Sequence, residues 1–231
     1  MRLARYIALA GICSRRQASR LIDEGRVEVN RAPGNHIYQV VPGDEIRVDG
    51  VPVPEIAPRV YFAFHKGVGI DSKCIPEDSS SIVHLLPECA RVYPVGRLDK
   101  DSRGLLLLTN DGALCQRLLH PDYYHEKEYR VSLDKPIDSQ FVMRMAQGVD
   151  IGKAVTRPCE VEQVEERQFV ITLTQGLNRQ IRKMARALGY NVVDLQRVRI
   201  VNIGLGDLAV NTYRALSPDE LSALQLSLSP A

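Results

Sequence analysis

A cluster of charged side chains stands directly before four consecutive leucines, in the stretch "GRLDKDSRGLLLLTND" at residues 96–111. Asp99 and Asp101 alternate there with basic residues, which are Arg97, Lys100 and Arg103. A carboxylate held at the entrance of a buried strand could do chemistry on a polyanion that the basic residues attract. A solvated loop of mixed charge is the simpler interpretation of the same residues.

The segment "LDKDS" also matches the D-x-D-x-S/T pattern of phosphotransferases that use an aspartate nucleophile. Those enzymes place the apolar strand before the aspartates, whereas here the leucines follow them, so we reject this interpretation. His120, Asp122 and His125 have side chains that bind metals, but "HPDYYHEKEY" is more typical of a polar loop that enters a strand. We therefore expect no metal site. A glycine-rich loop that could bind phosphate is missing as well.

The composition limits the class of protein. With 231 residues, the chain can form one large domain or a small and a medium one. A hydrophobic content of 45% and a charged content of 25% are typical of a soluble globular protein. Because the net charge is only +2, any nucleic-acid signal must come from local basic segments.

The cysteines and the apolar segments indicate the compartment. Five cysteines, an odd number without C-x-x-C spacing, argue against a disulfide framework and against a zinc site. No signal-peptide pattern opens the sequence, and no apolar run reaches the length that spans a membrane. We therefore expect a cytoplasmic protein without membrane contact.

The first fifty residues predict a small helical and strand-containing domain. Apolar residues at helical spacing over residues 3–10 predict a helix that ends at Gly11. Ser14 and Gln17 form a capping-box pattern for a second helix. Two strands, "RVEVN" and "EIRVDG", follow with the turn "PGD" between them. Three prolines in "GVPVPEIAPR" then predict a linker over residues 51–59.

From residue 60 to residue 231, strand and helix patterns interleave and predict one α+β domain. The predicted strands are "VYFAFHK", "GLLLLT", "KEYRVSL", "QFVITLTQG" and "DLQRVRIVNIGLG". The predicted helices are "SIVHLL", "DGALCQRLL", "SQFVMRMAQG" and "NRQIRKMARALG".

The N-terminal segment resembles a known RNA-binding domain. Its basic residues over positions 1–31 are all arginine, and a planar guanidinium binds phosphate through two hydrogen bonds. The ordered motifs "GICSRRQA", "LIDEGRVEVN" and "PGDEIRV" are similar to the alpha-L RNA-binding domain, first recognised in a small-subunit ribosomal protein. The resemblance covers residues 1–50 and implies binding to structured RNA through its backbone and shape.

The remainder resembles a family of enzymes. The ordered set "GRLDKDSRGLLLLTNDG", "HEKEYRV" and "LTQGLNRQIRKM" is similar to the ribosomal-type pseudouridine synthases, which carry an N-terminal alpha-L domain. The longer forms "HEKEYRVSLDKPI" and "QGLNRQIRKM" are typical of a subgroup that acts on large-subunit ribosomal RNA. The resemblance implies a catalytic domain built on a mixed, mainly antiparallel sheet with flanking helices.

The resemblance also implies a role for several residues. The family's nucleophilic aspartate falls on Asp99, and Arg182 matches the cation that keeps this carboxylate ionised. Arg97 matches the arginine that fills the stack when the target nucleotide is extruded. Tyr129 matches the aromatic residue on one uracil face, and Ile181 is expected on the other. Further RNA contacts are expected from Arg5, Arg15, Arg16, Arg20, Arg26, Asn178 and Arg179.

Isomerisation of uridine breaks one carbon–nitrogen bond and forms one carbon–carbon bond, so no cofactor is expected. The expected partner is RNA, ribosomal in the first place, and the protein is expected to act as a monomer. Two alternatives remain open from the sequence. The same chemistry could act on transfer RNA or on 16S ribosomal RNA, or the chain could be a non-catalytic RNA-binding assembly factor that retains the fold.

Overall fold

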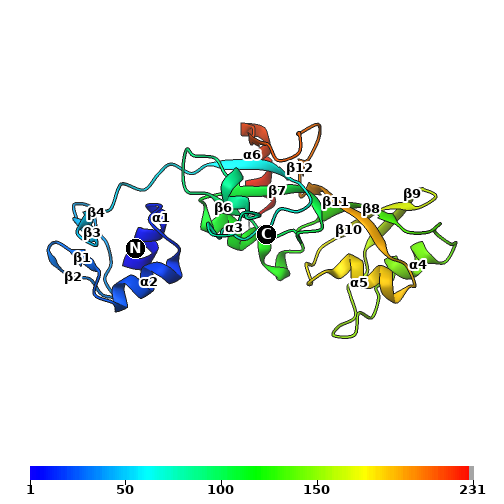
Figure 1. The fold of residues 1–231 in the computed structure, drawn as a ribbon, viewed down its shortest axis with the longest axis horizontal. Helices are drawn as coiled ribbons and strands as arrows, with labels where there is room; N and C mark the ends of the chain where they lie inside the picture. The colour runs from blue at the N-terminus through cyan, green and yellow to red at the C-terminus, as the bar shows by residue number, and fades with distance from the viewer. Residues whose placement is uncertain (229–231) are drawn as a thin grey trace. The chain divides into compact units, whose positions relative to one another are not determined.

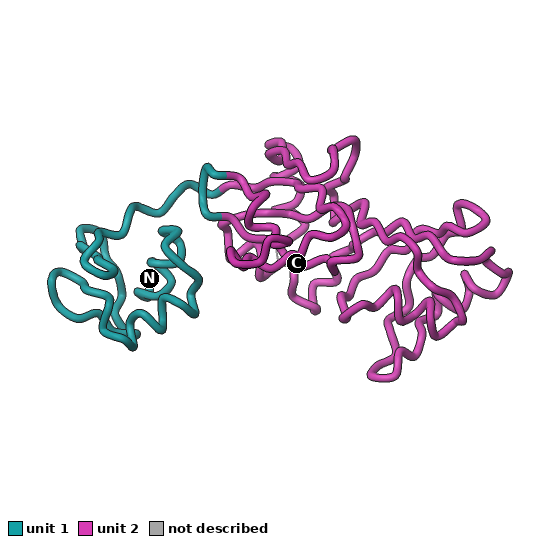
Figure 2. Tube along the Cα trace, in the orientation of Figure 1, with its two compact units in different colours: residues 1–59, 88–91 teal, residues 60–87, 92–231 magenta. Residues whose placement is uncertain are grey.

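The computed structural model describes residues 1–228 and divides into two compact units (Figure 2). Unit 1 comprises Met1–Arg59 together with Glu88–Arg91, and unit 2 contains the remaining residues. The last three residues of the predicted catalytic domain, 229–231, lie outside the described part. Among residues 1–228, no helix has both the length and the apolar character needed to cross a membrane.

Unit 1 contains two helices and a four-stranded sheet. The helices are α1 (Leu3–Leu9) and α2 (Arg15–Asp23), and the sheet has the order β2-β1-β3-β4. Its strands are β1 (Val27–Val29), β2 (Ala32–Pro33), β3 (Ile46–Val48) and β4 (Val51–Pro52). The Ser14 side chain accepts a hydrogen bond from the Gln17 backbone and the Gln17 side chain accepts one in return, as the capping box predicts.

The predicted linker needs one correction. Val51 and Pro52, which the proline spacing assigned to it, form β4 and pair with β3. Pro52 is tolerated there because β4 is an edge strand, where a proline removes no hydrogen bond from the sheet interior.

Unit 2 is built on a nine-stranded sheet with the main order β13-β5-β7-β11-β8-β10-β9 (Figure 1). The pairing of β7 with β11 is parallel, and the other pairings along this path are antiparallel, so the predicted mixed, mainly antiparallel sheet is confirmed. The strands are β5 (Tyr61–Lys66), β6 (Tyr93–Pro94), β7 (Arg103–Thr109), β8 (Lys127–Leu133), β9 (Glu160–Glu165), β10 (Gln168–Leu173), β11 (Val192–Ile200), β12 (Ile203–Gly204) and β13 (Tyr213–Ala215).

The helices of unit 2 are α3 (Gly112–Leu119), α4 (Phe141–Ala146), α5 (Gln180–Ala187) and α6 (Pro218–Ser227). Two short 3-10 helices, η1 (Ile82–Leu85) and η2 (Pro121–Tyr123), complete it. The segment predicted as a short helix, "SIVHLL", is therefore a 3-10 turn. The predicted strand "DLQRVRIVNIGLG" is two strands, β11 and β12, because the chain turns at Val201, whose φ is +51°.

The four leucines of β7 fix the strand between two cores. Leu105 and Leu107 pack on one side with residues of α3 and α6, whereas Leu106 and Leu108 pack on the other with Phe64 and Ile82. A continuous apolar run is what a strand buried on both faces requires. The loop before β7 is thus attached to a rigid element.

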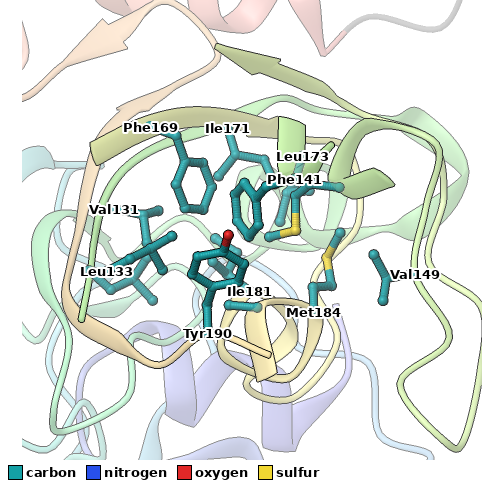
Figure 3. Packing of buried hydrophobic residues seen from close by; sticks show 13 residues of the cluster. Val131, Leu133, Phe141, Val149, Phe169, Ile171, Leu173, Ile181, Met184 and Tyr190 are labelled. Atoms are coloured by element: carbon teal, nitrogen blue, oxygen red, sulfur yellow. The ribbon is translucent and has the colours of Figure 1, made fainter. Parts of the chain in front are cut away.

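A separate core supports the other end of the sheet. Phe141 of α4 contacts Phe169 of β10 and Tyr190, with ring centroids 5.2 and 4.6 Å apart (Figure 3). Ile181 and Met184 of α5 pack into the same cluster. The apolar face of α5 is therefore fixed against β8 and β10, which holds the loop that leads into this helix.

Candidate active site

The loop that carries Asp99 connects β6 to β7, and hydrogen bonds to its backbone hold it in place. The Ser72 hydroxyl donates to the Leu98 carbonyl at 2.8 Å and accepts from the Leu98 amide at 3.2 Å. The Ser102 amide donates to the Asp99 carbonyl at 3.0 Å, which closes a turn directly before the buried strand. The Asp99 side chain keeps 29% of its surface exposed, so the carboxylate is accessible and also held in place.

The structure corrects the predicted partner of Asp99. The guanidinium beside this carboxylate belongs to Arg179, whose Nη1 lies 3.8 Å from Asp99 Oδ2. Arg179 also donates to both oxygens of Asp101, at 3.1 and 2.7 Å. This hydrogen-bonded pair lowers the pKa of Asp101 below its usual value. Arg179, expected to contact only RNA, therefore provides the positive charge next to both aspartates.

Arg182 instead connects two backbone segments. Its Nη1 donates to the Val192 carbonyl at 3.0 Å, and its Nη2 donates to the Asp101 carbonyl at 2.7 Å. Its Nε lies 3.4 Å from the Asp101 carboxylate, and only 13% of its side chain is exposed. Arg182 thus contacts Asp101 and not Asp99, the partner that the sequence predicted. It therefore orients the loop rather than the Asp99 carboxylate.

Asp99 borders a cavity of about 570 Å³, a volume typical of sites for small ligands. Most of the predicted substrate residues lie on its wall, namely Arg97, Tyr129 and Ile181, together with Asn178 and Arg179. Tyr129 comes from β8 and Ile181 from α5, so the two expected walls of a base-binding slot arise from different elements. Arg182 is not among the residues of the wall.

The cavity also contains cations that the sequence did not single out. Lys127 begins β8 two residues before Tyr129, and Arg197 lies on β11 opposite Tyr129. Burial, and secondly the charge of Arg197, lower the pKa of Lys127 to about 8. The alternation of β8 could have identified Lys127, because residues two apart share a face of a strand. The place of Arg197 follows from strand pairing, which a single sequence does not reveal.

The arginines of unit 1 that the sequence predicted as RNA contacts fall into two groups. Arg5, Arg15, Arg16 and Arg20 are exposed, and none of them takes part in the ion pairs of the described residues. Arg26 differs, because its guanidinium donates to both oxygens of Asp49 at 2.7 Å and to Glu24 at 3.1 Å. The donors of Arg26 are therefore used within the unit, whereas those of the other four face solvent.

The acidic and histidine side chains are dispersed. Within residues 1–228, no three or more His, Cys, Asp or Glu side chains are grouped as a metal site would require. His120 precedes η2 and Asp122 lies within it, and the His120 side chain accepts a hydrogen bond from the Asp122 amide. The segment that contains them is a turn leading toward β8, as the sequence predicted.

Comparison with known proteins agrees with this arrangement. Residues 60–187 match the family model described as RNA pseudouridylate synthase, and residues 1–46 match the S4 domain model. The dual-specificity RNA pseudouridine synthase RluF of Escherichia coli K12 is 44% identical over 96% of this chain and 77% of its own. The ribosomal large subunit pseudouridine synthase B of Bacillus subtilis is 34% identical over 97% of this chain and 95% of its own.

A solved structure shares the whole fold. A crystal structure of a pseudouridylate synthase superimposes with a TM-score of 0.71 at 29% identity, over 97% of this chain and 99% of that one. The sequence match, the structural match and the conjunction of Asp99, Tyr129 and Ile181 around one cavity lead to the same assignment. This chain belongs to the RNA pseudouridine synthase family, as the resemblance of its motifs predicted.

Proposed function

We propose that this protein converts a specific uridine of large-subunit ribosomal RNA into pseudouridine, with the Asp99 carboxylate acting on the ribose. The observation that carries the proposal is the position of Asp99, which is fixed before a buried strand, accessible from a 570 Å³ cavity and 3.8 Å from a guanidinium. A nucleophilic carboxylate needs such access and such a charge.

The cavity fits the remaining steps of the reaction. Tyr129 and Ile181 are proposed to hold the flat faces of the uracil ring while it is detached and turned, so that the base cannot escape. Arg97 lies at the exposed side of the cavity, where it is proposed to stack in the space that the extruded nucleotide leaves in the RNA. The reaction exchanges bonds within one nucleotide, so the proposal includes no cofactor.

The choice of RNA comes from two considerations. A relative that covers nearly the same length is named for the large ribosomal subunit, and the exposed arginines of unit 1 suit phosphate binding. Arg5, Arg15, Arg16 and Arg20 are proposed as these contacts, and Asn178 and Arg179 as contacts near the cavity. The name of the other relative records two RNA specificities, so transfer RNA is tested beside ribosomal RNA. Because the cavity is formed by one chain, we propose a monomer, acting in the cytoplasm.

The test has a cellular and a biochemical part. Pseudouridine mapping in ribosomal and transfer RNA, from cells with and without the protein, should reveal a site that is lost and that returns on complementation. With purified protein and RNA labelled with tritium at uracil C5, Asp99→Asn should abolish tritium release while RNA binding persists. Asp207→Asn, which alters an exposed carboxylate of unit 2, is the matched control. Tritium release by Asp99→Asn at the wild-type rate would refute the role of Asp99, and an unchanged pseudouridine map would refute the RNA substrate.

A further inference from the structure

The cavity wall is strongly unbalanced in charge. Among the described residues, the wall has a single acidic side chain, Asp99, and five cationic ones: Arg97, Lys127, Arg157, Arg179 and Arg197. Arg157 stacks on the Tyr124 ring, with 4.2 Å from its guanidinium carbon to the ring centroid, and Arg179 is engaged by the aspartates. Lys127 and Arg197 have neither kind of partner among the described contacts.

Arg197 is the most deeply buried of these cations, with 3% of its surface exposed. Its Nε donates to the Leu105 carbonyl at 2.7 Å, which fixes the guanidinium against β7. Its buried Nη2 has no hydrogen-bond partner among the described residues. A buried donor without a partner is unfavourable and requires an explanation.

A bulge in β11 places Arg197 in this position. Arg197 stands opposite Tyr129 and Arg199 opposite Glu128, so one additional residue, Val198, interrupts the alternation of the strand. Arg199 is consequently paired with Glu128 and with Glu126, both at 3.0 Å, whereas Arg197 is buried at the cavity. The bulge thus gives the two arginines different surroundings. Arg199 is paired with carboxylates, whereas Arg197 has no carboxylate partner among the described residues.

Lys127, like Arg197, lines the cavity. Its Nζ donates to the His125 carbonyl at 3.0 Å, and it shares a strand face with Tyr129. The charge of Arg197 acts on Lys127, and the two cations repel each other. Two repelling cations in a partly desolvated cavity are stabilised when an anion binds between them.

We propose that Arg197 and Lys127 bind the carbonyl oxygens of the uracil ring and stabilise the negative charge that it carries once detached from the ribose. This inference rests on the proposed function. When the C1′–N1 bond breaks, its electron pair stays on the base and spreads to the two carbonyl oxygens, while C1′ is bonded to Asp99. C5 then attacks C1′ and the Asp99 carboxylate leaves with the electron pair of its bond. C5 loses a proton to water and N1 gains one, so the atoms and charges balance.

The alternative is that the two cations bind an RNA phosphate. Burial favours the base, because the phosphates of a bound strand remain near the surface while the extruded uracil enters the cavity. The two roles have different consequences. A charge that develops during bond cleavage affects the rate of the chemical step, whereas a phosphate contact affects RNA affinity and its salt dependence.

The experiment compares the single-turnover conversion of RNA containing uridine with that of RNA containing 5-fluorouridine at the target site. The variants are Arg197→Lys, Arg197→Met and Lys127→Met, and thermal unfolding monitors their folding. Arg130→Met is the matched control, because Arg130 is an exposed residue of β8 and its removal changes the net charge equally. The measured quantity is the rate at which the target nucleotide is consumed.

Arg197→Met and Lys127→Met should slow the reaction of uridine by about 10²-fold, as the loss of one donor to a developing anion does in other enzymes. The loss should be at least tenfold smaller with 5-fluorouridine, because fluorine itself stabilises the detached base. Arg197→Lys should be intermediate, since lysine retains the charge but not the planar donors. If Arg197→Met does not fold, Lys127→Met provides the same comparison.

An equal loss with both substrates, or weaker RNA binding at an unchanged rate, would overturn the inference and indicate a structural or phosphate-binding role. Failure of the wild type and of Arg130→Met to convert any RNA would instead refute the proposed function. The two failures are therefore distinguishable.

Discussion

The guanidinium of Arg179 forms a bidentate pair with the Asp101 carboxylate, with hydrogen bonds of 3.1 and 2.7 Å, and its Nη1 also lies 3.8 Å from Asp99 Oδ2. One cation is thus shared by two carboxylates at unequal distances. Asp101 determines the orientation of the guanidinium, and Asp99 experiences its charge without being covered by it.

The first prediction concerns this arrangement. Asp101→Asn should slow isomerisation about tenfold, because Arg179 loses the carboxylate that orients it. Asp207→Asn should not change the rate. Arg179 lowers the pKa of Asp101 from its usual value of 3.8. The pair therefore stabilises the folded protein above pH 3.8, and this stabilisation is lost as the pH falls through the lowered pKa. The difference in unfolding free energy between wild type and Asp101→Asn should therefore shrink below about pH 4. A wild-type rate for Asp101→Asn would show that the pair does not position the site.

The second prediction separates Arg182 from Asp99. Arg182→Lys should lower the unfolding free energy by about 2 kcal/mol, because one ammonium cannot join the carbonyls of Asp101 and Val192. Arg186→Lys, an exposed position of the same helix, is the control. The pH–rate profile of single-turnover isomerisation should keep its shape even if the rate falls. A profile displaced to higher pH would instead indicate that Arg182 keeps Asp99 ionised.

The exchange of roles between Arg179 and Arg182 illustrates what one sequence can and cannot predict. The strand after Asp99 and the helix that carries Ile181 follow from apolar patterns, which reflect burial and are local in the chain. Which of two arginines three positions apart faces a given carboxylate depends on the start of α5. Arg179 has φ +51° there, a left-handed conformation that nothing in "GLNRQIR" specifies.

The missed elements have physical explanations of a similar kind. β9, "EVEQVE", is an edge strand whose side chains are mostly exposed, so it lacks the apolar alternation that identifies a strand. The α6 helix was identifiable, because Ser217, Pro218 and Glu220 form a capping box with proline in the first turn. The bulge at Val198, which sets Arg197 apart from Arg199, arises from pairing between distant strands.

The third prediction concerns the close approach of the paired strands β7 and β11 at Gly104. A Cβ at Gly104 would approach the backbone of Arg197 to 2.3 Å, and Gly104 has φ +111°. Gly104→Ala should therefore destabilise the fold by at least 2 kcal/mol, through both strain and displacement of β11. Gly204→Ala, where a Cβ would meet open space, should unfold within a few degrees of the wild type. Similar melting temperatures for the two variants would contradict this account of Gly104.

The fourth prediction uses the buried lysine of β5. The Lys66 ammonium has no exposed surface and donates to the carbonyls of Gly67 and Ile70 at 2.9 and 2.8 Å. Burial lowers its pKa from 10.5 to about 8. Between these values the unfolded chain holds the proton that the folded protein releases, so stability should rise with pH by up to about 1.4 kcal/mol per unit. Denaturant unfolding at pH 7, 8, 9 and 10 should show the full rise for the wild type and for Lys153→Met and a smaller rise for Lys66→Met, in which Lys127, whose pKa is also lowered to about 8, still contributes. Parallel pH dependence of all three would disprove the assignment.

The last prediction concerns how unit 1 holds RNA. Arg15, Arg16 and Arg20 are exposed on α2, a helix that buries Ala18 and Ile22. An arginine that neutralises a phosphate releases a counterion, so its loss makes the dependence of binding on salt less steep. Replacing all three by glutamine should reduce the slope of log Kd against log salt by about 2.

Arg26→Gln serves as the comparison because it removes one positive charge, as each of the three substitutions does, but from a guanidinium that already holds both oxygens of Asp49. Its salt slope should stay at the wild-type value, since no phosphate contact is lost, while unit 1 should unfold at a lower temperature. Binding of a ribosomal RNA fragment at several salt concentrations, with melting curves of each variant, measures both effects. If Arg26→Gln lowers the slope as much as each of the other arginines does, its contact with Asp49 must open when RNA binds. Arg26 would then belong to the RNA-binding surface, as the sequence alone suggested.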